Sequence, residues 1–146
     1  MLKGNDIYYD KMKVGKNIID NRDKSIKNYV AIFDIDDTIL DTTKNTLIEP
    51  IYNLYKYALS NKIYTVFITA REGNKENIKY TIKQLKFFNI KNYDLLYLRP
   101  PRLKDIEKFK LYSRMNITEC GYKPLFSIGD MYWDIGDFGG ESIHIC

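Results

Sequence analysis

Five short apolar segments constrain the fold of this chain more than any other feature of its sequence. They are Val30–Phe33, Ile63–Thr69, Tyr93–Leu98, Pro124–Ile128 and Ser142–Ile145. Most of their positions are apolar, whereas a strand with one face in water alternates apolar and polar residues. Segments of this kind are typical of strands that are covered on both faces, so the sequence predicts a buried parallel sheet.

Patterns typical of helices lie between these segments. Pro50 suits the first turn of a helix that continues to Ala58. Asn74 suits the N-cap of a second helix, and a third is expected from about Asp105 to Cys120. The second helix carries four apolar residues on one predicted face, namely Ile78, Ile82, Leu85 and Phe88. Strands and helices therefore alternate along the chain.

This alternation predicts an α/β fold, a doubly wound, Rossmann-like, five-stranded parallel sheet with helices on both faces. The 146 residues fit one domain. Residues 1–28 are expected to form a helical extension that packs on it.

Composition excludes several classes of protein. Hydrophobic residues make up 45% and charged residues 29%, which is ordinary for a globular domain, and the net charge of +4 slightly favours anionic substrates. Charges interrupt the N-terminus and no apolar run has the length of a membrane span, so a soluble, cytoplasmic chain without a membrane partner is expected. With two cysteines and one histidine, any metal must be held by oxygen ligands.

Polar residues follow three of the predicted strands. Asp34 and Asp36 come directly after the first strand, Thr69 ends the second, and Asp130 and Asp134 follow the fourth. The carboxyl ends of parallel strands meet at one edge of the sheet, where such folds bind their ligands. Taken one at a time, these residues could equally be a helix cap, a strand end and a turn. Their joint occurrence, in this order, favours a functional site.

The joint pattern resembles the haloacid dehalogenase-like (HAD) superfamily of phosphatases, most closely its acid-phosphatase-like, capless branch (subclass III). The resemblance rests on Asp34-x-Asp36-x-Thr38, Thr69, and a lysine before Gly129-Asp130-x-x-x-Asp134. The segments FDIDDTILDT, ITAREGN and LYLRPP are also similar to segments of that branch. It implies a single HAD-like hydrolase domain over residues 1–146 with no sizeable cap domain, and a site limited mainly by the segment 42–49 or by a partner subunit.

The resemblance also implies a chemistry, that of a Mg²⁺-dependent phosphomonoester hydrolase. Asp34 is the nucleophile that forms an aspartyl phosphate, and Asp36 protonates the leaving oxygen and later deprotonates the attacking water. The Thr69 hydroxyl binds a phosphoryl oxygen. The Mg²⁺ ligands are the Asp34 carboxylate, the Asp36 backbone carbonyl and Asp130, with Asp134 farther out or bound through water.

The basic residues are harder to assign. Lys104, Lys108 and Lys110 all lie in the interval where the phosphate-binding lysine is expected, and the apolar pattern does not choose among them. The resemblance places that lysine on Lys110 and a further arginine on Arg114. Three other arginines fall near the same edge, namely Arg71, Arg99 and Arg102. Arg71 is predicted to bind substrate, although solvated surface arginines are an equal interpretation for all three.

Several alternatives stay open. Within the same superfamily these are a nucleotidase, a nucleic-acid end phosphatase or a phosphotransferase, and the substrate is a small molecule or an exposed phosphate on a macromolecule. A phospho-accepting receiver domain is disfavoured because its phosphorylated aspartate follows a later strand, and an inactive binding domain because every catalytic position is filled. The sequence leaves the oligomeric state open, a homo-oligomer included.

Overall fold

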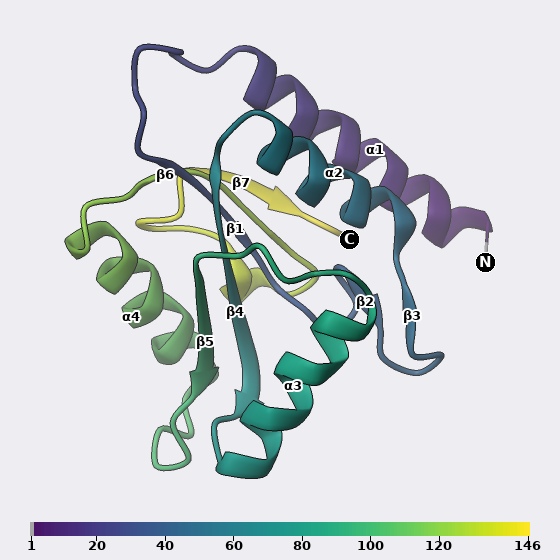
Figure 1. Ribbon diagram of the computed structural model, residues 1–146, viewed down its shortest axis with the longest axis vertical. Coiled ribbons are helices and arrows are strands. Elements are labelled where there is room, and N and C mark those ends of the chain that lie inside the picture. The colour runs from purple at the N-terminus through teal and green to yellow at the C-terminus, as the bar shows by residue number, and fades with distance from the viewer. Residues whose placement is uncertain (1) are drawn as a thin grey trace.

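A parallel five-stranded sheet forms the centre of the molecule (Figure 1), in a computed structural model that describes residues 2–146. Its strands are β1 (Tyr29–Phe33), β4 (Tyr64–Glu72), β5 (Leu95–Arg99), β6 (Lys123–Gly129) and β7 (Glu141–His144), in the order β5-β4-β1-β6-β7. Every pairing in this sheet is parallel. The predicted α/β architecture with five parallel strands is therefore confirmed, and the first strand lies in the middle.

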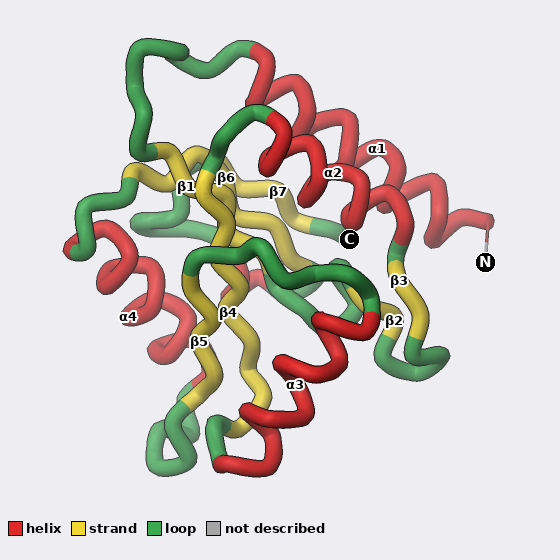
Figure 2. Tube along the Cα trace, in the orientation of Figure 1, coloured by secondary structure: helices red, strands yellow, loops and turns green. Residues whose placement is uncertain are grey.

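Helices cover both faces of the sheet (Figures 1 and 2). On one face lie α1 (Leu2–Asp20), α2 (Glu49–Ser60) and α3 (Lys75–Phe87), whose buried apolar side chains share one core cluster. On the other face α4 (Ile106–Glu119) packs through Phe109 and Ile117 against the alternate residues of β1 and β4. No helix in the described residues has both the length and the apolar character needed to span a membrane.

The helices α2, α3 and α4 begin where the sequence predicts. Pro50 lies in the first turn of α2, and the Asn74 side chain caps α3 by accepting the Asn77 N–H at 2.8 Å. Asp105 caps α4 in the same way through the Lys108 N–H at 3.0 Å. These caps satisfy N–H groups that have no partner inside the helix.

The predicted buried face of α3 is wrong in part. Ile78 and Ile82 are 37% and 43% exposed, whereas Thr81, Gln84 and Leu85 are buried. The helix therefore turns a largely polar face inward. The reason lies in the tertiary structure, because Thr81 and Gln84 bond to side chains outside the helix.

Two further differences lie near the carboxyl edge of the sheet. β4 does not end at Thr69 but continues to Glu72, with a shift of register against β5 between these residues. The chain after β1 also forms a small antiparallel hairpin of β2 (Leu40–Asp41) and β3 (Thr46–Leu47), which sequence analysis missed. Strands of two residues are too short to leave a periodic pattern. This hairpin contains the only strands between Asp37 and the start of α2, and this described segment holds no helix.

Aromatic rings fill the core beneath β1. The Phe67 ring lies 5.7 Å, between centroids, from each of the rings of Phe33, Tyr55 and Tyr93. Phe67 has no exposed surface. Its side chain therefore joins the central strand to α2 and to the segment before β5.

Removing the Phe67 ring should destabilise the whole fold. We expect Phe67→Ala to lower the free energy of unfolding by about 3–5 kcal/mol, because the cavity cannot collapse among rings held from three elements. Urea denaturation measures this loss. Phe87→Ala is the matched control, since Phe87 is 80% exposed and should change stability by no more than about 0.5 kcal/mol. Similar losses in the two variants would contradict this account of the core.

Candidate active site

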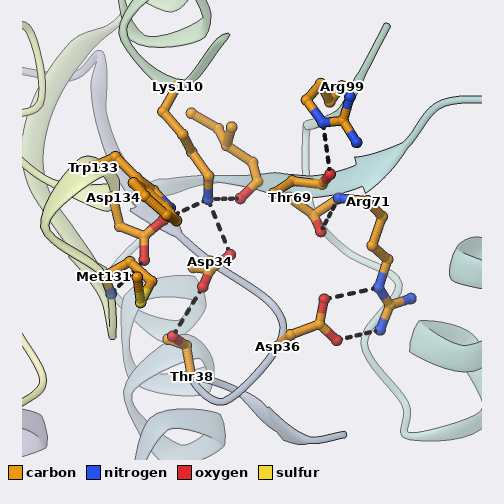
Figure 3. Close-up of polar contacts among 12 residues, drawn as sticks. Asp34, Asp36, Thr38, Thr69, Arg71, Arg99, Lys110, Met131, Trp133 and Asp134 are labelled. Carbon is orange, nitrogen blue, oxygen red and sulfur yellow. Dashed lines mark hydrogen bonds and ion pairs between the residues drawn. The ribbon is translucent and has the colours of Figure 1, made fainter. Parts of the chain in front are cut away.

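The side chain of Lys110 brings together residues from four elements at the carboxyl edge of the sheet (Figure 3). Its Nζ lies 3.0 Å from Asp34 Oδ1, 2.5 Å from Asp134 Oδ1 and 2.8 Å from the carbonyl oxygen of Ile68. Only 2% of Lys110 is exposed. Lys104 and Lys108, by contrast, are exposed on the surface. Of the three candidate lysines, Lys110 is thus the one that contacts Asp34.

The backbone fixes Asp34 where β1 ends. Its N–H donates to the carbonyl oxygen of Ile128 in β6 at 3.1 Å, so the residue continues the sheet by one bond. The Thr38 hydroxyl donates to its Oδ2 at 3.3 Å. Asp34 is 8% exposed. Its carboxylate is therefore held from both sides and reaches solvent over a small area.

The charges of this cluster are strongly coupled. Burial raises the pKa of Asp34, and Lys110 opposes this shift only in part. For Lys110 burial acts the other way, but the two carboxylates outweigh it and raise the pKa of the ammonium. Lys110 therefore stays charged, and both carboxylates contact the same ammonium group.

A third carboxylate, Asp130, completes an acidic cluster. Carboxylate oxygens of Asp34, Asp130 and Asp134 all lie within 4.8 Å of one another. Burial raises the pKa of Asp130, and the nearby charge of Asp134 acts in the same direction. When all three are ionised, the cluster with Lys110 carries two net negative charges. Oxygen donors with this excess of charge fit a hard divalent cation such as Mg²⁺.

Both carboxylate oxygens of Asp134 have partners, as both oxygens of Asp34 do. The Oδ2 of Asp134 accepts the Met131 N–H at 3.0 Å, while Oδ1 faces Lys110. A side chain at Gly129 would place Cβ 2.3 Å from the Cβ of Asp134, so only glycine lets the two segments approach so closely. The Gly-Asp turn of the sequence is therefore needed for packing inside the site.

Asp36 lies apart from the acidic cluster. Arg71 holds its carboxylate with two bonds, Nη2 to Oδ1 at 2.7 Å and Nε to Oδ2 at 3.0 Å, and the Thr42 hydroxyl adds a third at 2.6 Å. Burial raises the pKa of Asp36, but these hydrogen bonds outweigh it and hold the pKa below its ordinary value. In this state Asp36 is ionised.

Arg71 connects several parts of the site. Its backbone N–H donates to Thr69 Oγ1 at 3.2 Å, and its Nη1 donates to the Thr81 hydroxyl at 3.0 Å. Thr69 Oγ1 accepts this bond and donates none within the described residues, so its proton is available to another acceptor. Arg71 thus contacts Asp36 directly and positions Thr69 through the backbone.

The remaining arginines have structural partners or lie outside. Arg99 donates to the backbone carbonyl of Ala70 in β4 and to that of Leu103 in the loop after β5, and so ties this loop to the sheet. Arg102 is exposed. Arg114 is 4% exposed and donates to the carbonyls of Trp133 and Asp137. It therefore secures the loop that carries Asp134.

Sequence analysis missed one contact of the N-terminal helix. The Tyr8 hydroxyl donates to the carbonyl oxygen of Asp37 at 2.7 Å, at a residue with a left-handed backbone (φ 59°). Burial, together with the nearby charges of Asp37 and Asp130, raises the pKa of Tyr8 to about 12. Tyr8 lies far before the Asp34–Thr38 motif in the chain, so no local pattern could have indicated this contact.

Comparison of the chain with models of known protein families and with curated protein sequences found no match.

Removing the Lys110 charge should destabilise the protein. We expect Lys110→Met to lower the free energy of unfolding by about 3–5 kcal/mol, because it leaves buried carboxylates without their partner. Urea denaturation at neutral pH measures the loss. Lys108→Met removes an exposed ammonium two residues away and should cost no more than about 0.5 kcal/mol. Equal losses would show that the buried ion pairs contribute little.

Proposed function

We propose that this protein is a Mg²⁺-dependent phosphomonoester hydrolase in which Asp34 forms an aspartyl phosphate. The observation that carries the proposal is the buried Lys110 ammonium, which lies 3.0 Å from Asp34 beside two further carboxylates. A carboxylate nucleophile, a fixed cation and a cluster of oxygen ligands are the groups that phosphoryl transfer requires. The motif resemblance to HAD phosphatases supports the same conclusion.

The reaction takes two steps. In the first, a carboxylate oxygen of Asp34 attacks phosphorus while the bond to the leaving oxygen breaks, and that oxygen takes a proton from Asp36. In the second, water attacks the same phosphorus and gives a proton to Asp36. The bond to Asp34 then breaks and inorganic phosphate leaves. Transfer to an alcohol in place of water would make the enzyme a phosphotransferase.

Asp36 needs a proton before the first step. Arg71 and Thr42 hold it ionised in the present arrangement, which suits the second step, where it accepts a proton. These contacts must loosen for Asp36 to act as an acid. A leaving group that contacts Arg71 would weaken the bonds between Arg71 and Asp36, in keeping with the predicted role of Arg71 in substrate binding.

Charge on the phosphoryl group is offset by fixed donors. Lys110 supplies an ammonium that cannot turn away, because three acceptors surround it. The Thr69 hydroxyl has a free proton for a phosphoryl oxygen. Asp34 and Asp130, with the Asp36 carbonyl and the more remote Asp134, would hold the Mg²⁺ ion, which offsets further negative charge when bound.

The nucleophile can be tested directly. We expect Asp34→Asn to reduce the rate of aryl phosphate hydrolysis about a thousandfold or more, because an amide is a poor nucleophile. Acid-quenched wild type should carry a hydroxylamine-labile phosphate on Asp34. Asp37→Asn is the control, because the Asp37 side chain is exposed in the same loop. Rapid turnover by purified Asp34→Asn would disprove the mechanism.

Binding of the metal can be measured through thermal stability, independently of activity. We expect Mg²⁺ to raise the Tm of the wild type, since a ligand at a hundred times its Kd stabilises the folded state by about 2.7 kcal/mol. Asp130→Asn should abolish this rise, whereas Asp137→Asn, on an exposed loop position, should preserve it. Hydrolysis should stop in excess chelator. Full activity there, with no Tm response to Mg²⁺, would refute the assignment.

A further inference from the structure

The side of α1 that packs on α2 also carries the tyrosine that contacts the loop after β1. Four residues spaced by three or four positions share this side of the helix, namely Tyr8, Met12, Gly15 and Ile19. Met12 and Ile19 are buried in the core that α1 shares with α2, and Figure 1 shows α1 lying along α2. At Gly15 the two helices approach closely, because a Cβ there would lie 2.6 Å from Leu54 Cδ2. The packing of the whole helix therefore sets the position of Tyr8.

Three hydrogen bonds hold the backbone on the two sides of Asp37. On one side, the Asp37 N–H donates to the Leu40 carbonyl at 2.7 Å. On the other, the Asp37 carbonyl accepts the Tyr8 hydroxyl at 2.7 Å, and the Thr38 N–H donates to the Ile35 carbonyl at 3.2 Å. Asp37 itself has a left-handed backbone (φ 59°), which is unfavourable for residues other than glycine, although aspartate tolerates it better than most. These bonds therefore stabilise a conformation that the chain would not adopt by default.

The peptide group before Asp37 carries the Asp36 carbonyl. Because a peptide group is planar, the bond made by the Asp37 N–H also fixes the direction of this carbonyl. The Asp36 carbonyl oxygen accepts no backbone hydrogen bond within the described residues, so it is available to a cation. The charge of Asp130 acts on the Tyr8 hydroxyl and contributes to its raised pKa. Tyr8 therefore lies close to two groups that the proposed function assigns to the metal.

We propose that Tyr8 is a positioning residue for the Mg²⁺ site, acting through the Asp37 backbone on the Asp36 carbonyl. The inference rests on the proposed function, which takes this carbonyl and Asp130 as ligands of the ion. Without the Tyr8 hydroxyl, the peptide after Asp37 keeps only the longer bond from the Thr38 N–H. The φ angle of Asp37 joins the two peptide planes, so a change there also turns the Asp36 carbonyl. The exposed side chain of Asp37 takes no part in this contact.

Tyr8→Phe removes the hydroxyl and keeps the ring. We expect this variant to bind Mg²⁺ about threefold to tenfold more weakly, the range that the loss of one hydrogen bond gives, as measured by calorimetry without substrate. Tyr57→Phe is the matched control, because the Tyr57 hydroxyl on α2 donates to Asp20 at the other end of α1. Both variants lose one hydroxyl bond that involves α1, so a merely structural role of Tyr8 would leave their Mg²⁺ affinities equal. Incorporation of para-aminophenylalanine in place of Tyr8, which restores a donor, should recover most of the affinity.

The active protein gives a second measurement. Tyr8→Phe should need about threefold to tenfold more Mg²⁺ for half-maximal hydrolysis, while its rate at saturating Mg²⁺ stays close to that of the wild type. If the wild type binds Mg²⁺ and Tyr8→Phe binds it equally well, or if Tyr57→Phe loses as much affinity, the positioning role is wrong and the proposed function is unaffected. If no phosphate ester is hydrolysed but Tyr8→Phe alone weakens Mg²⁺ binding, the proposed function fails and the role of Tyr8 stands. A wild type that binds no Mg²⁺ would overturn both.

Discussion

The buried ammonium of Lys110 holds the carboxyl edge of the sheet in its present form. It contacts Asp34 after β1, the backbone of β4 at Ile68, and Asp134 in the loop after β6. Such a charge is tolerated in the interior only because oppositely charged and polar groups surround it. Each carboxylate depends on the same ammonium, so the three strand ends cannot move apart independently. The geometry that the proposed reaction needs is therefore also the arrangement that makes the buried charges tolerable.

Arg71 extends this arrangement outward. It is less buried than Lys110, and it joins Asp36 to Thr81 on α3 while its backbone fixes Thr69. One side of this arginine holds Asp36, and the other borders a hollow between α3 and the β2–β3 hairpin, where the ring of Tyr80 lies. A group that enters the hollow would thus meet the residue that controls the ionisation of Asp36. Substrate recognition and proton transfer would share one side chain.

Sequence analysis reached the sheet because strands buried on both faces leave unmistakable apolar runs, and it reached the acidic residues because parallel strands bring their ends together. It could not rank Lys108 against Lys110 without the motif resemblance, since residues two apart on a helix differ only in the direction they face. Sequence analysis mispredicted the inner face of α3 because Thr81 and Gln84 are buried there with hydrogen-bond partners outside the helix. The contact of Tyr8 with the Asp37 carbonyl was out of reach for the same reason.

The position of β1 in the middle of the sheet has a consequence for how the protein folds. Its neighbours are β4 and β6, and the bond between Asp34 and Lys110 spans 76 positions of the chain. Contacts of such long sequence separation form late, because a long loop must close before they can stabilise anything. Until then the central carboxylate has neither of its flanking strands nor its cation. Asp34, although encoded early, acquires its surroundings only when most of the chain has been synthesised and has collapsed around it.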